Sequence, residues 1–104
     1  MLDTDLLQSI ATKLMSDARA QIKGKTLAVR RTSRQHLRTM RFTMNGREYQ
    51  AIEQNASKPS RWGQLARAGH QVVQFKDAQT NRFVAVAVDG KVIEYSGRGR
   101  REEK

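Results

Sequence analysis

The sequence predicts an α+β domain in which two helices pack on antiparallel sheet, in the order α-β-β-β-α-β-β-β. Three observations lead to this fold class. Apolar residues near the N-terminus recur at every third or fourth position, as on one face of a helix. Later segments alternate between apolar and polar residues, as strands do. Asn-Gly and Asp-Gly pairs separate alternating segments and are typical of tight hairpins.

The chain has 104 residues, of which 38% are hydrophobic, which is enough for one small domain with one modest core. We expect residues 1–96 to form this domain. Residues 97–104 are polar, basic and partly glycine, so we expect them to form a disordered tail. No apolar run approaches the roughly 20 residues of a membrane span, and the N-terminus is acidic, so we expect a cytoplasmic protein.

Residues 4–23 are predicted to form the first helix. Asp3 or Thr4 would cap its N-terminus by accepting a backbone hydrogen bond, and Gly24 would end it. The residues expected on its buried face are Leu7, Ile10, Leu14, Ala18 and Ile22.

A strand is predicted over residues 26–32, followed by a hairpin that turns at Asn45-Gly46, where both positions require positive φ. The turn sets the register, so Met44 should oppose Arg47, Phe42 should oppose Tyr49, and Met40 should oppose Ala51. We expect that face to be core. The opposite face, expected to be largely exposed to water, carries Thr39, Arg41, Thr43, Glu48, Gln50 and Ile52.

The second half of the chain begins at Pro59, which is tolerated in the first turn of a helix. This helix should run to about Ala68, with Gly69 as its C-cap, and present Trp62, Leu65 and Ala66 inward. Strands follow at 71–76 and 82–88. A turn at Asp89-Gly90 would then pair Val88 with Lys91, Val86 with Ile93 and Val84 with Tyr95. Strand 82–88 is apolar on both faces, so we expect it to be buried on both sides and central.

The most one-sided feature is the segment from Arg19 to Arg47, which contains nine Lys or Arg residues and no acid. The whole chain carries a net charge of +10, and its pI is near 10.9. Such a segment attracts polyanions, and nucleic acid is the first to consider. We expect Arg30, Arg31, Arg34 and Arg41 to gather on one positive surface. The full set of predicted nucleic-acid-binding residues is Arg30, Arg31, Arg34, Arg41, Arg47, Lys58 and Arg61.

Lys58 and Arg61 form a second basic group beside Trp62, at the predicted start of the second helix. A helix N-terminus with basic side chains is able to hold a phosphate, and an exposed tryptophan is able to stack on a base. We interpret Trp62 as a core residue instead, because the chain has few aromatic side chains with which to fill its interior.

Candidate catalytic and metal-binding groups are scarce. The chain has no cysteine, and no acid lies close in sequence to His36 or His70. Glu53 is best explained as a cross-strand partner of Arg38. We therefore expect no enzyme activity, no metal and no cofactor.

Residues 4–68 follow the order helix, three strands, helix, with His36, the hairpin Phe42–Tyr49, and Ser57-Lys58 before a helix. This order resembles a double-stranded-RNA-binding domain, a family whose second helix opens with a lysine cluster that grips phosphates. Here Lys58 is followed by Pro59 instead, and three more strands follow the second helix. The resemblance is one of topology, and no residue role is assigned from it.

The sequence is best explained as a small nonenzymatic protein whose basic face binds RNA or DNA, mainly through phosphate contacts. The alternative is a protein-interaction module, homodimeric or with an acidic protein partner, that uses the strand Phe83–Val88 or a sheet edge.

Overall fold

The structure, a computed structural model, describes residues 3–95, and the predicted tail at 97–104 lies outside them. The predicted α+β class is confirmed. The order of elements also matches, except that five strands rather than three precede the second helix. The elements are α1 (Thr4–Met15), β1 (Ala20–Ile22), β2 (Lys25–Leu27), β3 (Arg30–Arg31), β4 (Arg38–Met44), β5 (Arg47–Glu53), α2 (Arg61–Arg67), β6 (Val72–Asp77), β7 (Phe83–Val88) and β8 (Lys91–Tyr95).

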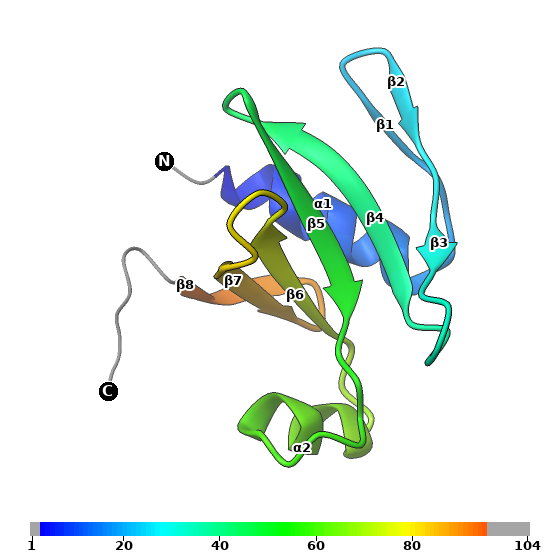
Figure 1. Cartoon of the computed structure of the whole chain (residues 1–104), viewed down its shortest axis with the longest axis vertical. Coiled ribbons are helices and arrows are strands. Elements are labelled where there is room, and N and C mark those ends of the chain that lie inside the picture. The colour runs from blue at the N-terminus through cyan, green and yellow to red at the C-terminus, as the bar shows by residue number, and fades with distance from the viewer. Residues whose placement is uncertain (1–2, 96–104) are drawn as a thin grey trace.

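Six of the strands form one antiparallel sheet in the order β3-β4-β5-β6-β7-β8, in which every strand pairs with its neighbour in sequence. Strands β1 and β2 form a separate two-stranded ribbon, called here the β1–β2 ribbon. Figure 1 shows α1 crossing one face of the sheet, and it shows the β1–β2 ribbon and α2 at opposite ends of the long axis of the molecule.

The core lies between α1 and the sheet. Asp3 caps α1 by accepting a hydrogen bond from the Leu6 N–H, and the apolar face of the helix buries Leu7, Ile10 and Leu14 completely. Alternate residues of the central strands of the sheet pack against this face of α1, because every second side chain of a strand points to the same side. The buried contributions of the sheet to the core include Met40, Phe42, Met44, Tyr49, Ala51, Val73, Phe75, Ala85 and Ala87.

The hairpin at Asn45-Gly46 is confirmed, with φ of 55° and 78° at its two turn residues, and its predicted register is also confirmed. Its outer face was expected to be largely exposed to water, but the end at Thr39 is not. Thr39 is buried because β3 lies beside it and pairs Arg30 with Thr39. Gln50 and Ile52 are half-buried, while the remaining outer-face residues of the hairpin are exposed.

The Asp89-Gly90 turn is confirmed by positive φ at both residues, and so is the pairing of Val88 with Lys91. The next two predicted pairings are wrong. The register shifts between Ala87 and Val86, counted away from the turn, so Val86 pairs with Glu94 and Ala85 pairs with Tyr95. An extra residue on one strand, a bulge, moves every later pair by one position.

Strand β7 is buried over Ala85–Ala87, as expected for a strand that is apolar on both faces. It is not central, because β8 is the edge strand and β7 lies next to it. The start of the strand is open to solvent, and Phe83 remains 48% exposed.

Helix α1 ends at Met15, well before the predicted end at Lys23. Asp17 has a φ of 56°, and the N–H of Ala18 donates to the carbonyl of Lys13 at 2.9 Å. This is a Schellman-type C-terminus in which an aspartate takes the place that glycine usually occupies.

The predicted helix stop at Gly24 is wrong, because Lys23 and Gly24 form the two-residue turn of the β1–β2 ribbon, with φ of 50° and 80°. The predicted strand at 26–32 is two short strands. Strand β2 pairs with β1, whereas β3 pairs with β4, so the chain changes partner between Leu27 and Arg30.

Helix α2 begins at Arg61 rather than at the predicted Pro59, because Ser60 is its N-cap and its hydroxyl accepts a hydrogen bond from the N–H of Gly63. Trp62, Leu65 and Ala66 are half-buried, and Gly63 is the buried residue of this helix. The interpretation of Trp62 as a core residue is therefore only partly correct. The helix contacts the sheet at β6, and its apolar residues Trp62, Leu65 and Ala66 remain partly exposed.

Candidate nucleic-acid interface

The segment from Arg19 to Arg47 contains no acid, but several of its arginines form ion pairs with carboxylates from other parts of the chain. Four of its arginines form ion pairs: Arg31 and Arg38 with Asp17, Arg38 also with Glu53, Arg41 with Glu48, and Arg47 with Asp77. The other five basic residues of the segment form no ion pair within residues 3–95. These are Arg19, Lys23, Lys25, Arg30 and Arg34.

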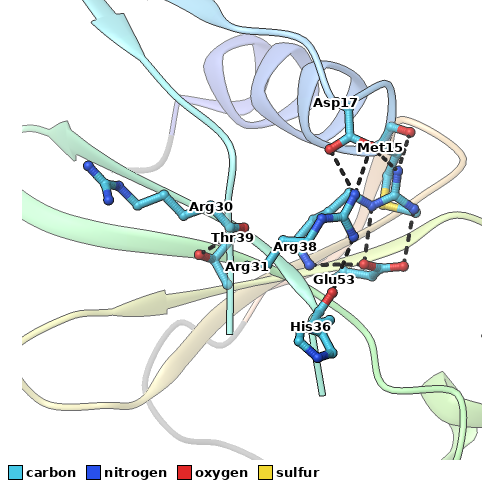
Figure 2. A network of polar contacts seen from close by, with 8 residues as sticks. All are labelled: Met15, Asp17, Arg30, Arg31, His36, Arg38, Thr39 and Glu53. Carbon is cyan, nitrogen blue, oxygen red and sulfur yellow. Dashed lines mark hydrogen bonds and ion pairs between the residues drawn. The ribbon is translucent and has the colours of Figure 1, made fainter. Parts of the chain in front are cut away.

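Arg38 lies at the centre of a partly buried network of polar contacts (Figure 2). Its guanidinium donates to both carboxylate oxygens of Glu53, at 3.2 and 3.1 Å, and to the carbonyl oxygen of Met15 at 2.8 Å. The expected pairing of Arg38 with Glu53 is confirmed. Because Met15 is the last residue of α1, the network fastens the end of the helix to β4 and β5 and has a structural role.

The pKa values in this network follow from the contacts. Burial alone would raise the pKa of Glu53, but the side-chain and backbone hydrogen bonds from Arg38 outweigh burial and lower it. The same side-chain hydrogen bond raises the pKa of Arg38, which stays charged.

Arg30 and Arg31 do not share a surface, although both lie on β3. The Arg31 guanidinium donates to both oxygens of Asp17, at 3.1 and 3.0 Å, and to the carbonyl of His36. Arg30 extends away from this network, as Figure 2 shows. The prediction that Arg30, Arg31, Arg34 and Arg41 all gather on one surface is therefore wrong, because neighbouring residues of a strand point to opposite faces.

A groove lies between the β1–β2 ribbon and β4, and we call it the β2–β4 groove. It consists of two hollows of about 360 and 270 Å³ that share Leu27 and Arg41. The first is lined by Ile22, Lys23, Lys25, Leu27, Arg41, Phe42, Thr43, Asn45, Gly46 and Glu48. The second is lined by Thr26, Leu27, Ala28, Arg30, Thr39 and Arg41.

The β2–β4 groove is strongly basic. Among the residues that the structure describes, four cationic side chains line it, from Lys23, Lys25, Arg30 and Arg41, against the single carboxylate of Glu48. The groove exists because the chain changes strand partner: β3 pairs with β4 only at Arg30 and Arg31, and the ribbon beyond it stands beside the rest of β4 (Figure 1).

Glu48 does not close the groove. Its ion pair with Arg41 spans 3.3 Å, and both side chains are more than half exposed, at 52% and 60%. An exposed ion pair of this kind contributes at most about 1 kcal/mol and is screened by salt. An incoming phosphate is therefore able to compete with Glu48 for Arg41.

Lys23 stands at the tip of the ribbon in the left-handed region of φ, where Asn, Asp or Gly is usual. Its neighbour Gly24 supplies the second positive φ of the turn. A lysine at this position adds charge to the groove at a cost in backbone strain.

Arg47 belongs to a different site. It donates to Asp77 at 2.9 and 2.6 Å, and the Asp77 side chain is only 9% exposed. The other oxygen of Asp77 accepts from the N–H groups of Gln79 and Thr80 in the loop after β6. The hydrogen bond from Arg47 and these two lower the pKa of Asp77, and Arg47 supports that loop.

Besides Arg31 and Arg47, three more predicted binding residues do not line the groove. Arg34 is exposed in the turn between β3 and β4, and does not line either hollow. Lys58 and Arg61 lie at α2, at the far end of the molecule from the ribbon (Figure 1). The Arg61 guanidinium is 4.3 Å from the ring centroid of Trp62, a cation–π contact.

One pair of titratable residues is not apparent from sequence proximity. His70 Nδ1 lies 2.8 Å from a carboxylate oxygen of Asp89, and the other oxygen accepts from the N–H of Gln71. Strand register brings the two residues near each other, since Val72 pairs with Val88, which places Gln71 opposite Asp89 and His70 one residue further along the chain. The bond from Gln71, followed by that from His70, lowers the pKa of Asp89.

Within residues 3–95, no group of three or more His, Asp or Glu side chains gathers as metal ligands would. None of the helices that the structure describes is long and apolar enough to cross a membrane. Comparison of the chain with protein-family models, with curated proteins and with solved structures gave no match.

Proposed function

We propose that this chain is a nonenzymatic cytoplasmic protein that binds nucleic acid through the β2–β4 groove, mainly by contacts with phosphates. The observation that carries this proposal is the convergence of Lys23, Lys25, Arg30 and Arg41 on one groove, where residues 3–95 place a single, exposed carboxylate, that of Glu48. Lysine and arginine side chains displace the cations condensed on a polyanion, which is the main source of affinity that does not depend on sequence.

The proposal excludes part of the predicted site. Arg31 and Arg47 are held by Asp17 and Asp77, so their charges are already balanced within the fold. Arg30 and Arg41 remain as predicted binding residues, and Lys23 and Lys25 join them. Sequence reasoning missed the two lysines because it placed Lys23 at a helix end and Lys25 before a strand.

Fluorescence anisotropy of a labelled oligonucleotide across a salt series tests this proposal. With about four phosphates neutralised, the logarithm of the binding constant should fall with the logarithm of salt concentration with a slope of about −3 to −4. A groove variant with Lys23→Asn, Lys25→Gln and Arg30→Gln should flatten this slope.

The matched control removes the same charge elsewhere, with Lys13→Gln, Arg82→Gln and Lys91→Gln. These three residues are exposed and do not line either hollow. The control should retain most of the affinity. Equal losses in both variants, or no binding at low salt with protein at high micromolar concentration, would contradict the proposal.

A second candidate is a protein-interaction module that dimerises, or binds an acidic partner, through the β8 edge of the sheet. Phe83 and Ile93, on the last two strands, are each 48% exposed, which favours an apolar contact there. Light scattering during size-exclusion chromatography tests the dimer. Replacing Ile93 with Lys should dissociate it, whereas a monomer at all concentrations removes the dimeric form of this candidate.

A further inference from the structure

We infer that the β2–β4 groove binds a single-stranded nucleic acid in preference to a duplex, with nucleotides entering the two hollows. This inference rests on the proposed function and narrows its ligand. Three properties of the groove carry it: the size of the hollows, the chemistry of their walls and the length of β4 beside them.

The hollows have the size of small-molecule sites. At about 360 and 270 Å³, each is near the lower end of the range of ligand pockets, roughly 300–1,000 Å³. A nucleoside-sized group fits a space of this kind. In a duplex the bases are stacked inside, and extruding one costs a few kcal/mol, whereas the bases of a single strand are already accessible.

The walls divide into apolar and charged parts. Ile22 and Leu27 are half-buried and offer apolar surface on the ribbon side of the groove. The cations stand around them on exposed positions, at Lys23, Lys25 and Arg30. An apolar wall with a charged rim suits a base and its phosphate together, while a surface that contacts only the outside of a duplex needs no apolar wall.

The groove also has the length of a short strand of nucleic acid. The residues of β4 that line the groove run from Thr39 to Thr43, and four residue steps of about 3.4 Å give about 14 Å. Phosphates on one strand of a helical nucleic acid recur roughly every 3.4 Å along the axis. The groove therefore has room for roughly three to five nucleotides, which matches the four cations along it.

Anisotropy with a labelled 12-nucleotide single strand, and with the same strand annealed to its complement, tests the inference. The single strand should bind at least about fivefold tighter than the duplex at equal salt. A variant expected to bind more tightly adds a second test. Its site is Thr26, which is exposed and lines the second hollow. Thr26→Tyr adds a stacking surface and should tighten single-strand binding by about fivefold or more, with little change for the duplex.

The control for this variant is Gln79→Tyr, which places the same aromatic on an exposed loop after β6, at a position that lines neither hollow. It should leave both affinities unchanged. Duplex binding as tight as single-strand binding, or equal tightening of both by Thr26→Tyr, would overturn the inference and leave the proposed function in place. If the parent protein binds neither oligonucleotide, both the inference and the proposed function are wrong. Tighter binding of polyglutamate than of either oligonucleotide would favour the acidic protein partner.

Discussion

Arg30 and Arg31 are adjacent on β3, yet Arg30 lines the β2–β4 groove and Arg31 is bound to Asp17 on the opposite side of the sheet. The two residues therefore have different tasks despite their identical chemistry. One offers an uncompensated charge to a ligand, and the other holds the C-terminal end of α1 against the sheet.

This division predicts opposite effects of the same substitution. Arg30→Gln should weaken nucleic-acid binding by about two- to fivefold, as for loss of one exposed ion pair, and leave the unfolding midpoint unchanged. Arg31→Gln should lower the midpoint in urea and leave binding nearly unchanged. Anisotropy and urea titration of both variants check this. An equal loss of affinity in the two variants would show that position on the strand does not decide the role.

Glu48 is expected to oppose binding, because it occupies Arg41 at the groove. Among residues 3–95, Glu48 supplies the only carboxylate that lines the hollows, so for Glu48→Gln the affinity for an oligonucleotide should rise by about two- to fivefold at low salt. The gain should shrink as salt is added, because salt screens exposed charges. Asp5→Gln, an exposed change of the same sign on α1, is the control for net charge alone. Unchanged affinity in the Glu48 variant would place the bound phosphates elsewhere.

Lys23→Asn separates binding from folding, because asparagine tolerates positive φ better than lysine and Asn-Gly is the preferred pair for this turn. The variant should be more stable by a few tenths to about 1 kcal/mol. Its affinity for nucleic acid should nevertheless fall by about two- to fivefold. Urea denaturation and anisotropy on the same preparation measure both quantities. A variant that binds as the parent protein does would exclude Lys23 from the interface.

Gly63→Ala tests the packing of α2. Helix propensity alone predicts a gain of about 1 kcal/mol. The structure predicts a loss, because a Cβ at this position would overlap the carbonyl oxygen of Lys58, which is backbone and has little freedom to move. We expect a net destabilisation of about 1–3 kcal/mol. Gln64→Ala, on the exposed side of the same helix, is the control and should be neutral or slightly stabilising.

Acid should destabilise the fold below about pH 4. The pKa values of Glu53, Asp77 and Asp89 are all lowered in the folded state, so the unfolded chain binds more protons as the pH falls. The stability that these carboxylates contribute is complete above their unfolded pKa values, near 4, and is lost as the pH falls through the folded values.

Urea midpoints measured from pH 2.5 to pH 6 follow this loss. Asp77→Asn keeps an oxygen that accepts from Gln79 and Thr80 but removes the charge that Arg47 binds. The variant should be less stable at pH 6 and show a smaller decline towards low pH than the parent protein. A decline as steep as that of the parent would mean that the pair with Arg47 does not contribute.

Local chemistry accounts for the parts of the fold that the sequence predicts well. The hairpin at Asn45-Gly46 and its register follow from two facts that act within a few residues: the turn requires positive φ, and the strands alternate. The start of α1 is similarly local, because its cap, Asp3, bonds to the N–H of Leu6 within the first turn. These elements need no knowledge of their neighbours.

The end of α1 could not be predicted in the same way. The spacing of Ala18 and Ile22 continues the helical pattern, and glycine at position 24 is compatible with both a helix end and a hairpin turn. The helix ends at Met15 because Asp17 adopts positive φ and binds Arg31 and Arg38, two residues that are distant in sequence. Only folding brings Arg31 and Arg38 next to Asp17 at the C-terminal end of α1.

The class of fold, the turns at Asn45-Gly46 and Asp89-Gly90 and the excess of positive charge follow directly from the amino-acid sequence, because each depends on residue type and short-range spacing. The tertiary structure decided which charges are available to a partner. Asp17, Glu53 and Asp77 reach across the fold to neutralise some arginines, and the change of strand partner after Leu27 opens a groove beside Lys25 and Arg30. Charge is additive along a chain, but its exposure depends on which side chains the packing brings within hydrogen-bonding distance.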